Sequence, residues 1–168
     1  MDVFEAIKAR RAYRSLAPVE ITPELIADLA RCARLAPSCN NNQPWRFVFV
    51  YGRENLERVH PSLNSPGNDW AKAASLIVAV CSRKEDDCVI RDREYHLLGD
   101  GLATAFLILR ATELGLVAHP IAGFSPPPMK TNCQGGSIWV MPRIRSKSYA
   151  SVTCPTHIAT GPGGRSAG

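Results

Sequence analysis

Apolar residues near the start of the chain recur at helical spacing in two stretches. Asp2 is a suitable N-cap for a helix over residues 3–10, in which the apolar side chains share one face. Thr22 and Pro23 supply the N-cap and the first-turn proline of a second helix, which we expect to end before Pro37.

The middle of the chain contains two continuous apolar runs and one long apolar helix. Residues 47–51 and 76–81 lack clean alternation, which predicts strands that are buried on both faces. A short helical stretch begins at Glu54 between them. The pattern predicts a helix over residues 92–114 that stops at Gly115 and is apolar enough to be buried all round, in a core or between subunits.

The hydrophobic pattern ends soon after a short strand that we expect around residues 120–121. Three prolines stand at 126–128, and the residues that follow are rich in Gly, Ser, Pro, Lys and Arg without periodicity, apart from one apolar run. Such a composition is typical of irregular or disordered chain. We therefore expect a folded domain over residues 1–125 and an atypical tail over residues 126–168, which is either disordered or the product of a frameshift.

The composition and the distribution of charge argue against a nucleic-acid-binding protein and a membrane protein. The 168 residues suit one domain, and the formal charge of +5 is concentrated in the first fourteen residues and in the tail. That placement favours a local anion site over a nucleic-acid-binding face, so we expect no nucleic-acid partner. Every apolar run is much shorter than the roughly eighteen residues that a membrane span needs, and the N-terminus lacks a signal-peptide pattern. We expect a cytoplasmic protein with no membrane partner.

The cysteines give no sign of a metal site. None of the six forms a C-x-x-C pair, and the four histidines do not cluster with them at ligand spacing. Free thiols are therefore expected, and Cys39 is interpreted as a small loop residue rather than a redox group.

Two polar segments could carry chemistry. Residues 10–14 place three arginines at the end of the first helix, where forked guanidinium donors suit a phosphate, although solvated surface arginines are the alternative. Residues 37–45 gather three asparagines and a glutamine between prolines. Such a loop could recognise the edge of a planar polar heterocycle, or it could be a turn, because asparagine favours turns.

Taken in order, these segments resemble the opening of the nitroreductase family. The motif Arg-Arg-x-x-Arg at residues 10–14 precedes Ala-Pro-Ser-x-x-Asn-x-Gln-Pro-Trp at residues 36–45. The resemblance continues through residues 76–81 and ends with Glu-Leu-Gly-Leu at 113–116 and His-Pro-Ile-Ala-Gly-Phe at 119–124. It covers about residues 1–125.

The resemblance implies a fold and a cofactor. The fold would be α+β, with three α/β/α layers and a mostly antiparallel central sheet flanked by helices, and the protein would be a homodimer with FMN bound at the subunit interface. The activity would be ping-pong hydride transfer from NAD(P)H, through flavin N5, to a small acceptor such as a nitroaromatic or a quinone. Reductive dehalogenation or flavin fragmentation is a more specialised alternative, and flavin binding without turnover is another.

The resemblance also assigns cofactor-binding residues and no catalytic side chain. Arginines would hold the FMN phosphate and ribityl chain, the loop would line the isoalloxazine ring, and a later segment would pass its other face. Ala12 stands where the family usually has serine, and Ala122 stands where it often has glutamate. The full set is Arg10, Arg11, Ala12, Arg14, Pro37, Ser38, Cys39, Asn41, Gln43, Pro120, Ile121, Ala122 and Gly123.

The tail departs from the family. The expected Leu-Gly-x-Pro turn, the final apolar strand and the basic residue that returns to the FMN phosphate are missing from residues 126–168. When the codons for residues 138–142 are read in a frame shifted by two bases, they permit the sequence Leu-Gly-x-Ala. In that frame the genetic code allows only glycine and only alanine at those two positions. A frameshifted ending is one hypothesis, and a natural divergent tail is the other.

Overall fold

The computed structural model describes residues 1–63, 67–121, 134–141 and 143–144, with backbone alone from residue 134 onward. The first two predicted helices are present as α1 (Val3–Ala9) and α2 (Pro23–Ala33). Both begin as predicted: the Asp2 carboxylate accepts from the backbone N–H of Glu5, and the Thr22 hydroxyl accepts from that of Leu25.

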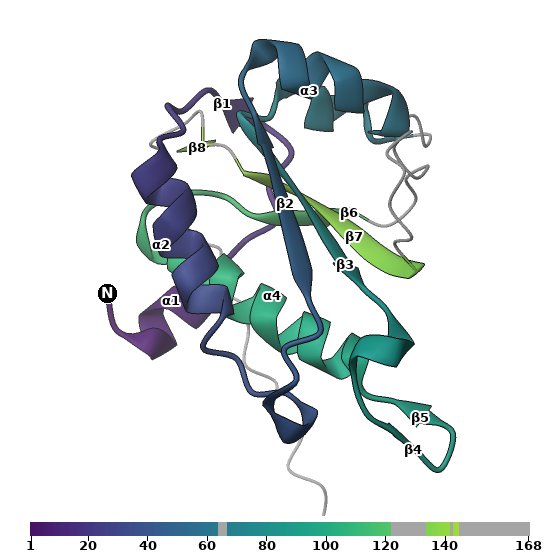
Figure 1. Ribbon diagram of the computed structural model, residues 1–168. Helices are drawn as coiled ribbons and strands as arrows, with labels where there is room; N and C mark the ends of the chain where they lie inside the picture. The colour runs from purple at the N-terminus through teal and green to yellow at the C-terminus, as the bar shows by residue number, and fades with distance from the viewer. Residues whose placement is uncertain (64–66, 122–133, 142, 145–168) are drawn as a thin grey trace, which may run out of the picture.

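A four-stranded antiparallel sheet forms the centre of the fold (Figure 1). Its order is β2 (Arg46–Tyr51), β3 (Leu76–Ser82), β7 (Gln134–Met141) and β6 (His119–Ile121). β2, β3 and β6 match the prediction, but β7 is a strand that the sequence pattern did not predict. β3 is largely buried on both faces, as expected. β2 is not, because it is the edge strand and remains half-exposed.

The long helix starts later than predicted. α4 spans His96–Glu113, because the residues before it form a hairpin of β4 (Val89–Ile90) and β5 (Arg93–Glu94). The two residues between these strands, Arg91 and Asp92, have positive φ, as a two-residue hairpin turn requires. The end of α4 is as predicted, with Gly115 at a φ of 73° just beyond it.

Shorter elements complete the described chain. They are the helix α3 (Arg53–Val59), the paired strands β1 (Leu16–Ala17) and β8 (Arg143–Ile144), and the 3₁₀ turns η1 (Cys39–Asn41), η2 (His60–Leu63), η3 (Asp69–Ala73) and η4 (Lys84–Asp86). Helices and antiparallel strands thus mix as the predicted α+β class requires.

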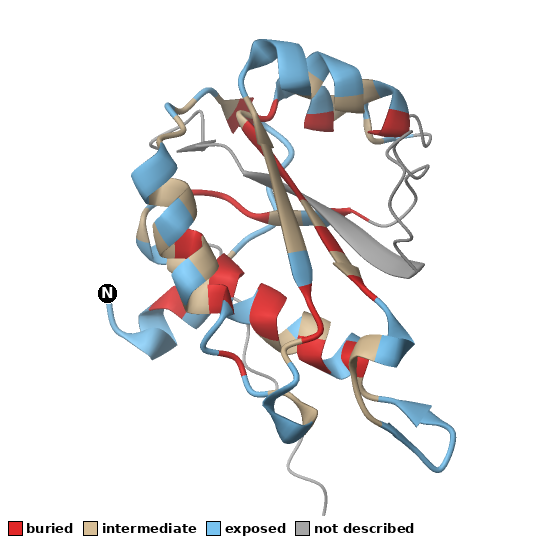
Figure 2. Cartoon of the chain, in the orientation of Figure 1, coloured by how far each residue is buried: buried red, intermediate tan, exposed pale blue. Residues whose placement is uncertain are grey.

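Two apolar clusters lie on opposite faces of β3, which Figure 2 shows as a buried strand. On one face, Val78 packs with residues of α2 and α4, such as Leu29 and Leu107. On the other, Ile77 packs with Ile121 of β6 and with residues around η2 and η3. Burial of these side chains on both faces fixes the position of β6 and of the residues that follow α4.

α4 is not buried all round within one chain. Its sheet-facing side is buried, but Leu97, Leu98 and Phe106 are 53%, 58% and 38% exposed. α1 likewise exposes Val3 and Phe4. Within the described residues, α4 and the other helices are all too short or too polar to cross a membrane.

Candidate functional site

The segment that follows α1 carries the predicted phosphate-binding arginines. Arg10 ends the helix, and its backbone N–H donates to Ala6 O at 3.0 Å. The Arg11 guanidinium turns back and donates to the carbonyls of Lys8 and Arg10, so it stabilises the C-terminus of α1. Ala12 and Arg14 are exposed. Neither Arg10 nor Arg14 forms an ion pair with a carboxylate in the described part of the chain, which leaves both charges available to an anion.

An aromatic stack connects these arginines to β6. The Arg14 guanidinium lies 5.7 Å from the centre of the Trp70 ring, and the Trp70 and His119 rings are 4.3 Å apart. His119 Nδ1 also donates to the Tyr13 carbonyl at 3.2 Å. These contacts bring residues 13 and 14 beside the start of the predicted flavin segment, where Pro120 is exposed and Ile121 is buried. Ala122 and Gly123 lie outside the described residues.

The polar loop has a strained, internally bonded conformation. Asn40, Asn41 and Gln43 have φ values of 48°, 56° and 48°, in the left-handed region that side chains disfavour. The Gln43 N–H donates to Ser38 Oγ at 2.9 Å, and Gln43 Nε2 donates to Asn41 Oδ1 at 3.1 Å. Three of the predicted flavin-contacting side chains therefore shape the loop itself.

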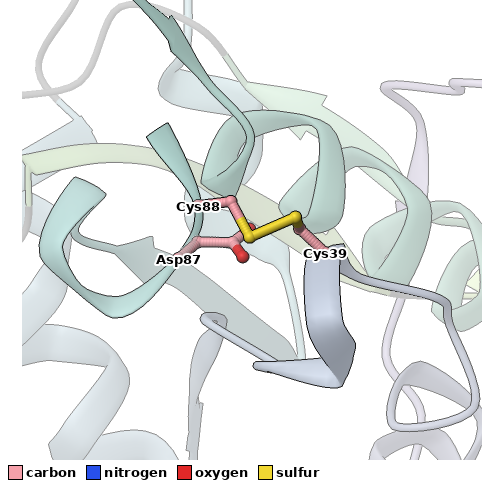
Figure 3. Close-up of side chains that lie close together, drawn as sticks. All are labelled: Cys39, Asp87 and Cys88. Atoms are coloured by element: carbon pink, nitrogen blue, oxygen red, sulfur yellow. A yellow bond between two sulfur atoms is a disulfide. The ribbon is translucent and has the colours of Figure 1, made fainter. Parts of the chain in front are cut away.

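The expectation of free thiols is wrong for Cys39 and Cys88, which form a disulfide (Figure 3). The two cysteines are 49 residues apart, so no local spacing reveals the pair. With Asp87 they form the one grouping in the described residues that could hold a metal ion, but the disulfide occupies both sulfurs. Cys32 remains a free thiol, as expected.

A buried polar cluster lies where β3 ends and α4 begins. The Ser82 hydroxyl is 2.7 Å from His96 Nδ1 and donates to the Asp100 carboxylate, while His96 Nε2 lies 3.2 Å from Glu94. Burial raises the pKa of Asp100, and the Ser82 hydrogen bond offsets part of that rise. Asp100 Oδ1 is buried with no hydrogen-bond partner in the described chain. The cluster joins β3 to α4 and does not include any predicted site residue.

One chain does not bring the loop and the arginines together. His119 pairs with Val140, which pairs with Ile77, which in turn pairs with Val50. Arg46, where β2 leaves the loop, is therefore about 13 Å along and 14 Å across the sheet from His119. The loop lies beyond Arg46, so it is about 20 Å from the Arg14 stack. Figure 1 shows η1 and β6 at separate places in the fold.

The sequence pattern included His119 in the motif at residues 119–124, but it did not indicate Trp70, Asp87 or Cys88 as neighbours of the predicted site. His119 and Trp70 sit in segments whose proximity depends on the pairing of β6 with β7 and on the packing of η3. A groove of about 460 Å³ between α3 and the segment that follows β1 has no predicted site residue in its lining, which includes Val19, Tyr51 and Arg53.

Comparison with known proteins gives matches to one family. The nitroreductase family profile matches residues 7–67. A proposed NADH dehydrogenase/NAD(P)H nitroreductase of Methanothermobacter thermautotrophicus is 33% identical over 70% of this chain and 59% of its own length. A protein of the same description from Rhodopseudomonas palustris is 32% identical over 68% of this chain and 67% of its own. The chain spans only 38% and 45% of two further relatives, from Bacillus subtilis and Archaeoglobus fulgidus.

Solved structures share the fold at low sequence identity. A nitroreductase family protein from Clostridium novyi NT has a TM-score of 0.77 and 18% identity, covering 88% of this chain and 89% of that protein. A proposed nitroreductase from Exiguobacterium sibiricum, solved in complex with FMN, has a TM-score of 0.77 and 21% identity, covering 92% and 94%. Together with the sequence relatives, these matches show that the chain belongs to the nitroreductase family.

Proposed function

We propose that the protein is an FMN-dependent oxidoreductase that moves a hydride from NAD(P)H to a small acceptor such as a nitroaromatic or a quinone. The observation that carries this proposal is that Arg14, which forms no ion pair with a carboxylate in the described residues, lies next to β6 in a chain of the nitroreductase family. Relatives described as NAD(P)H nitroreductases and a neighbour solved with FMN support the choice of nicotinamide and flavin.

The residues present fit the phosphate end of FMN. A phosphate dianion needs charged donors that are not already neutralised, and guanidinium groups meet that need with forked hydrogen bonds. The Arg14 guanidinium lies 5.7 Å from the centre of the Trp70 ring, and its N–H groups donate to no partner in the described residues. β6 is an edge strand of the sheet and pairs with β7 on one side. Its other edge, at Pro120 and Ile121, is where we place the flavin ring.

The loop would reach the same flavin from a second copy of the chain. It lies about 20 Å from the Arg14 stack within one chain. The ribityl chain from the ring to the phosphorus has about seven bonds of roughly 1.5 Å and spans less than about 10 Å, and the ring adds about 5 Å to its pyrimidine edge, so the cofactor is shorter than that separation. A site that uses both Arg14 and residues 37–43 therefore needs two subunits, each of which supplies one part.

Exposed apolar side chains support the homodimer. Val3, Phe4 and Ile7 on α1 and Leu97 and Leu98 on α4 are each more than half exposed in the single chain. Large exposed apolar side chains on two helices are typical of a protein–protein interface. We propose that α4 packs against its counterpart and that helices flank the sheet as three layers in the cytoplasmic dimer.

Each part of the chain would have a separate task. FMN, when bound, supplies reversible two-electron chemistry at its N5 atom. Arg10 and Arg14 fix the phosphate, and the loop holds the ring edge through its backbone and through Pro37, Ser38 and Cys39. We propose no side chain as a proton donor, because orientation by the protein and chemistry by the flavin account for the transfer.

The experiment is the visible spectrum of the purified protein, before and after addition of FMN and desalting. We expect flavin bands to remain with the protein, and we expect Arg14→Ala to lose them. Arg53→Ala is the matched control, because Arg53 is 92% exposed and pairs with Glu57 on α3, away from the stack. Protein that never retains FMN, or equal retention by both variants, would refute the site.

A second measurement separates the enzyme from a flavin-binding protein without turnover. NAD(P)H oxidation is followed at equal flavin occupancy with a nitroaromatic and with a quinone. Turnover with either acceptor supports the oxidoreductase. Stoichiometric FMN binding with no reduction of the flavin by NADH or NADPH would instead support the alternative, in which the atypical tail has cost the activity.

A further inference from the structure

The disulfide between Cys39 and Cys88 joins two surface segments rather than two parts of the core. Cys39 lies in η1 within the polar loop, and Cys88 lies just before β4. Neither belongs to the apolar clusters that hold the sheet and helices together. Both cysteines are half-buried, so a small thiol can reach the sulfurs without unfolding the protein. Figure 3 shows the bridge between the loop and the segment that leads into β4.

The loop that the disulfide holds has a conformation that the chain disfavours. Asn40, Asn41 and Gln43 all have positive φ, and each such residue costs free energy relative to the right-handed region. Local hydrogen bonds to Ser38 and Asn41 offset part of that cost. The covalent link to Cys88 and the hydrogen bond from Asn42 to Asp87 both tie the loop to the segment before β4, so opening the disulfide removes the covalent one of these constraints.

The surroundings of the bridge also favour an open state. A carboxylate oxygen of Asp87 and both sulfurs lie within 4.8 Å of one another. Asp87 Oδ1 accepts from Asn42, but Oδ2 is buried and has no hydrogen-bond partner in the described residues. A disulfide has no hydrogen to donate, whereas a thiol has one. Reduction therefore creates thiol donors beside a carboxylate whose Oδ2 has no hydrogen-bond partner in the described residues.

We propose that Cys39 and Cys88 form a reversible redox site, opened by dithiols and closed by small disulfides, which sets the conformation of residues 38–43. A dithiol's thiolate attacks Cys39 Sγ, the Cys39–Cys88 bond breaks and Cys88 leaves as a thiolate. The second thiol of the reductant then releases Cys39. Two electrons and two protons pass to the protein, and the dithiol becomes a disulfide.

The neighbouring amides identify the leaving sulfur. The Nδ2 atoms of Asn40 and Asn42 lie 3.5 and 3.7 Å from Cys88 Sγ. N–H donors stabilise a thiolate more than a neutral sulfur, and a more stable thiolate leaves faster. Cys39 is therefore the sulfur that the incoming thiol attacks. Closure runs in reverse when a small disulfide accepts the two electrons.

This chemistry does not depend on the proposed function, because it needs neither FMN nor NAD(P)H. Only an effect of the loop's conformation on FMN binding would depend on that function. All measurements below can be made on the protein without cofactor, so a failed redox site and a failed flavin site give different results.

The experiment uses the full chain in buffers of reduced and oxidised dithiol without denaturant. Rapid alkylation and peptide mass spectrometry report the state of each cysteine, and hydrogen exchange reports the loop. We expect a Cys39–Cys88 peptide in oxidising buffer, its loss in reducing buffer and its return on reoxidation. We expect exchange in residues 38–43 to quicken at least about tenfold on reduction.

Two variants provide the controls. Cys88→Ser should show fast loop exchange that no longer responds to the dithiol. Cys32→Ser removes a free thiol of α2 and should behave like the parent protein. The proposal is overturned if the linked peptide never forms, if it opens only in denaturant, or if loop exchange is the same in both states.

Discussion

Trp70 offers a direct test of whether the aromatic stack positions Arg14 for a phosphate. Trp70→Leu removes a ring that contacts both the Arg14 guanidinium and His119. Trp70→Phe keeps a ring in place and sacrifices no hydrogen bond, because Trp70 Nε1 has no partner in the described residues. Comparison of the two variants therefore separates the effect of an aromatic ring at this position from the effect of an apolar side chain without one.

The structure gives the size of the expected effect. An exposed cation–π contact is worth about 0.5–1 kcal/mol, and an aromatic pair adds about 0.5–1.5 kcal/mol. The stack is only half-buried, so we take the low end, about 1 kcal/mol, as the part that appears in binding. That value corresponds to an increase of about fivefold in the Kd for FMN in Trp70→Leu. Trp70→Phe should change the Kd by less than about twofold.

The assay is quenching of FMN fluorescence at two salt concentrations, with urea unfolding of each variant alongside. Phe47→Leu is the control for loss of a partly buried ring, because Phe47 stacks near Phe49 on β2 and not near Arg14. Equal Kd values for Trp70→Leu and Trp70→Phe would refute the positioning argument. So would an unchanged Kd in Arg14→Ala.

Three further predictions concern stability and the tail. Burial raises the pKa of Asp100 above its ordinary value of 3.8. The folded protein therefore loses stability as the pH rises from 3.8 through the folded-state pKa, because Asp100 then has to ionise in a buried position. Asp100→Asn should therefore gain stability relative to the parent with rising pH in urea unfolding, and a flat difference would contradict this. Leu107→Ala should lower the free energy of unfolding by about 2–5 kcal/mol, because Leu107 is 1% exposed in the main core, and a loss below about 1 kcal/mol would show that the site collapses. If residues 126–168 are a frameshift product, resequencing the gene will restore a Leu-Gly-x-Ala ending, whereas the same frame in independent isolates would end that hypothesis.

Local signals were enough to predict the elements that depend on neighbouring residues. The caps at Asp2 and Thr22, the stop at Gly115 and the apolar runs of β2 and β3 all act within a few residues, and the structure has each of them. β7 was missed because Gly135 and Gly136 weaken the strand pattern, and its place between β3 and β6 depends on partners more than fifteen residues away.

The site was harder to predict because its contacts are not local. The Arg-Arg-x-x-Arg motif marked a cationic segment correctly, but the motif does not show that Trp70 supports Arg14 or that Arg11 turns back onto α1. The Cys39–Cys88 pair was missed for the same reason, since the two residues meet only after β3 and the η4 turn carry Cys88 back to the loop.

The loop shows why a family motif can be identified while its roles are assigned differently. Gln43 donates hydrogen bonds to the side chains of Ser38 and Asn41. The backbone of Asn40, Asn41 and Gln43 is in the left-handed region. Asparagine tolerates that region better than most residues, so a run of three asparagines suits such a loop. The Gln43 and Asn41 amides bond to each other and so help to set the shape of the loop. Substituting Asn41 should therefore disturb loop shape, seen by hydrogen exchange without cofactor, before it disturbs any flavin contact.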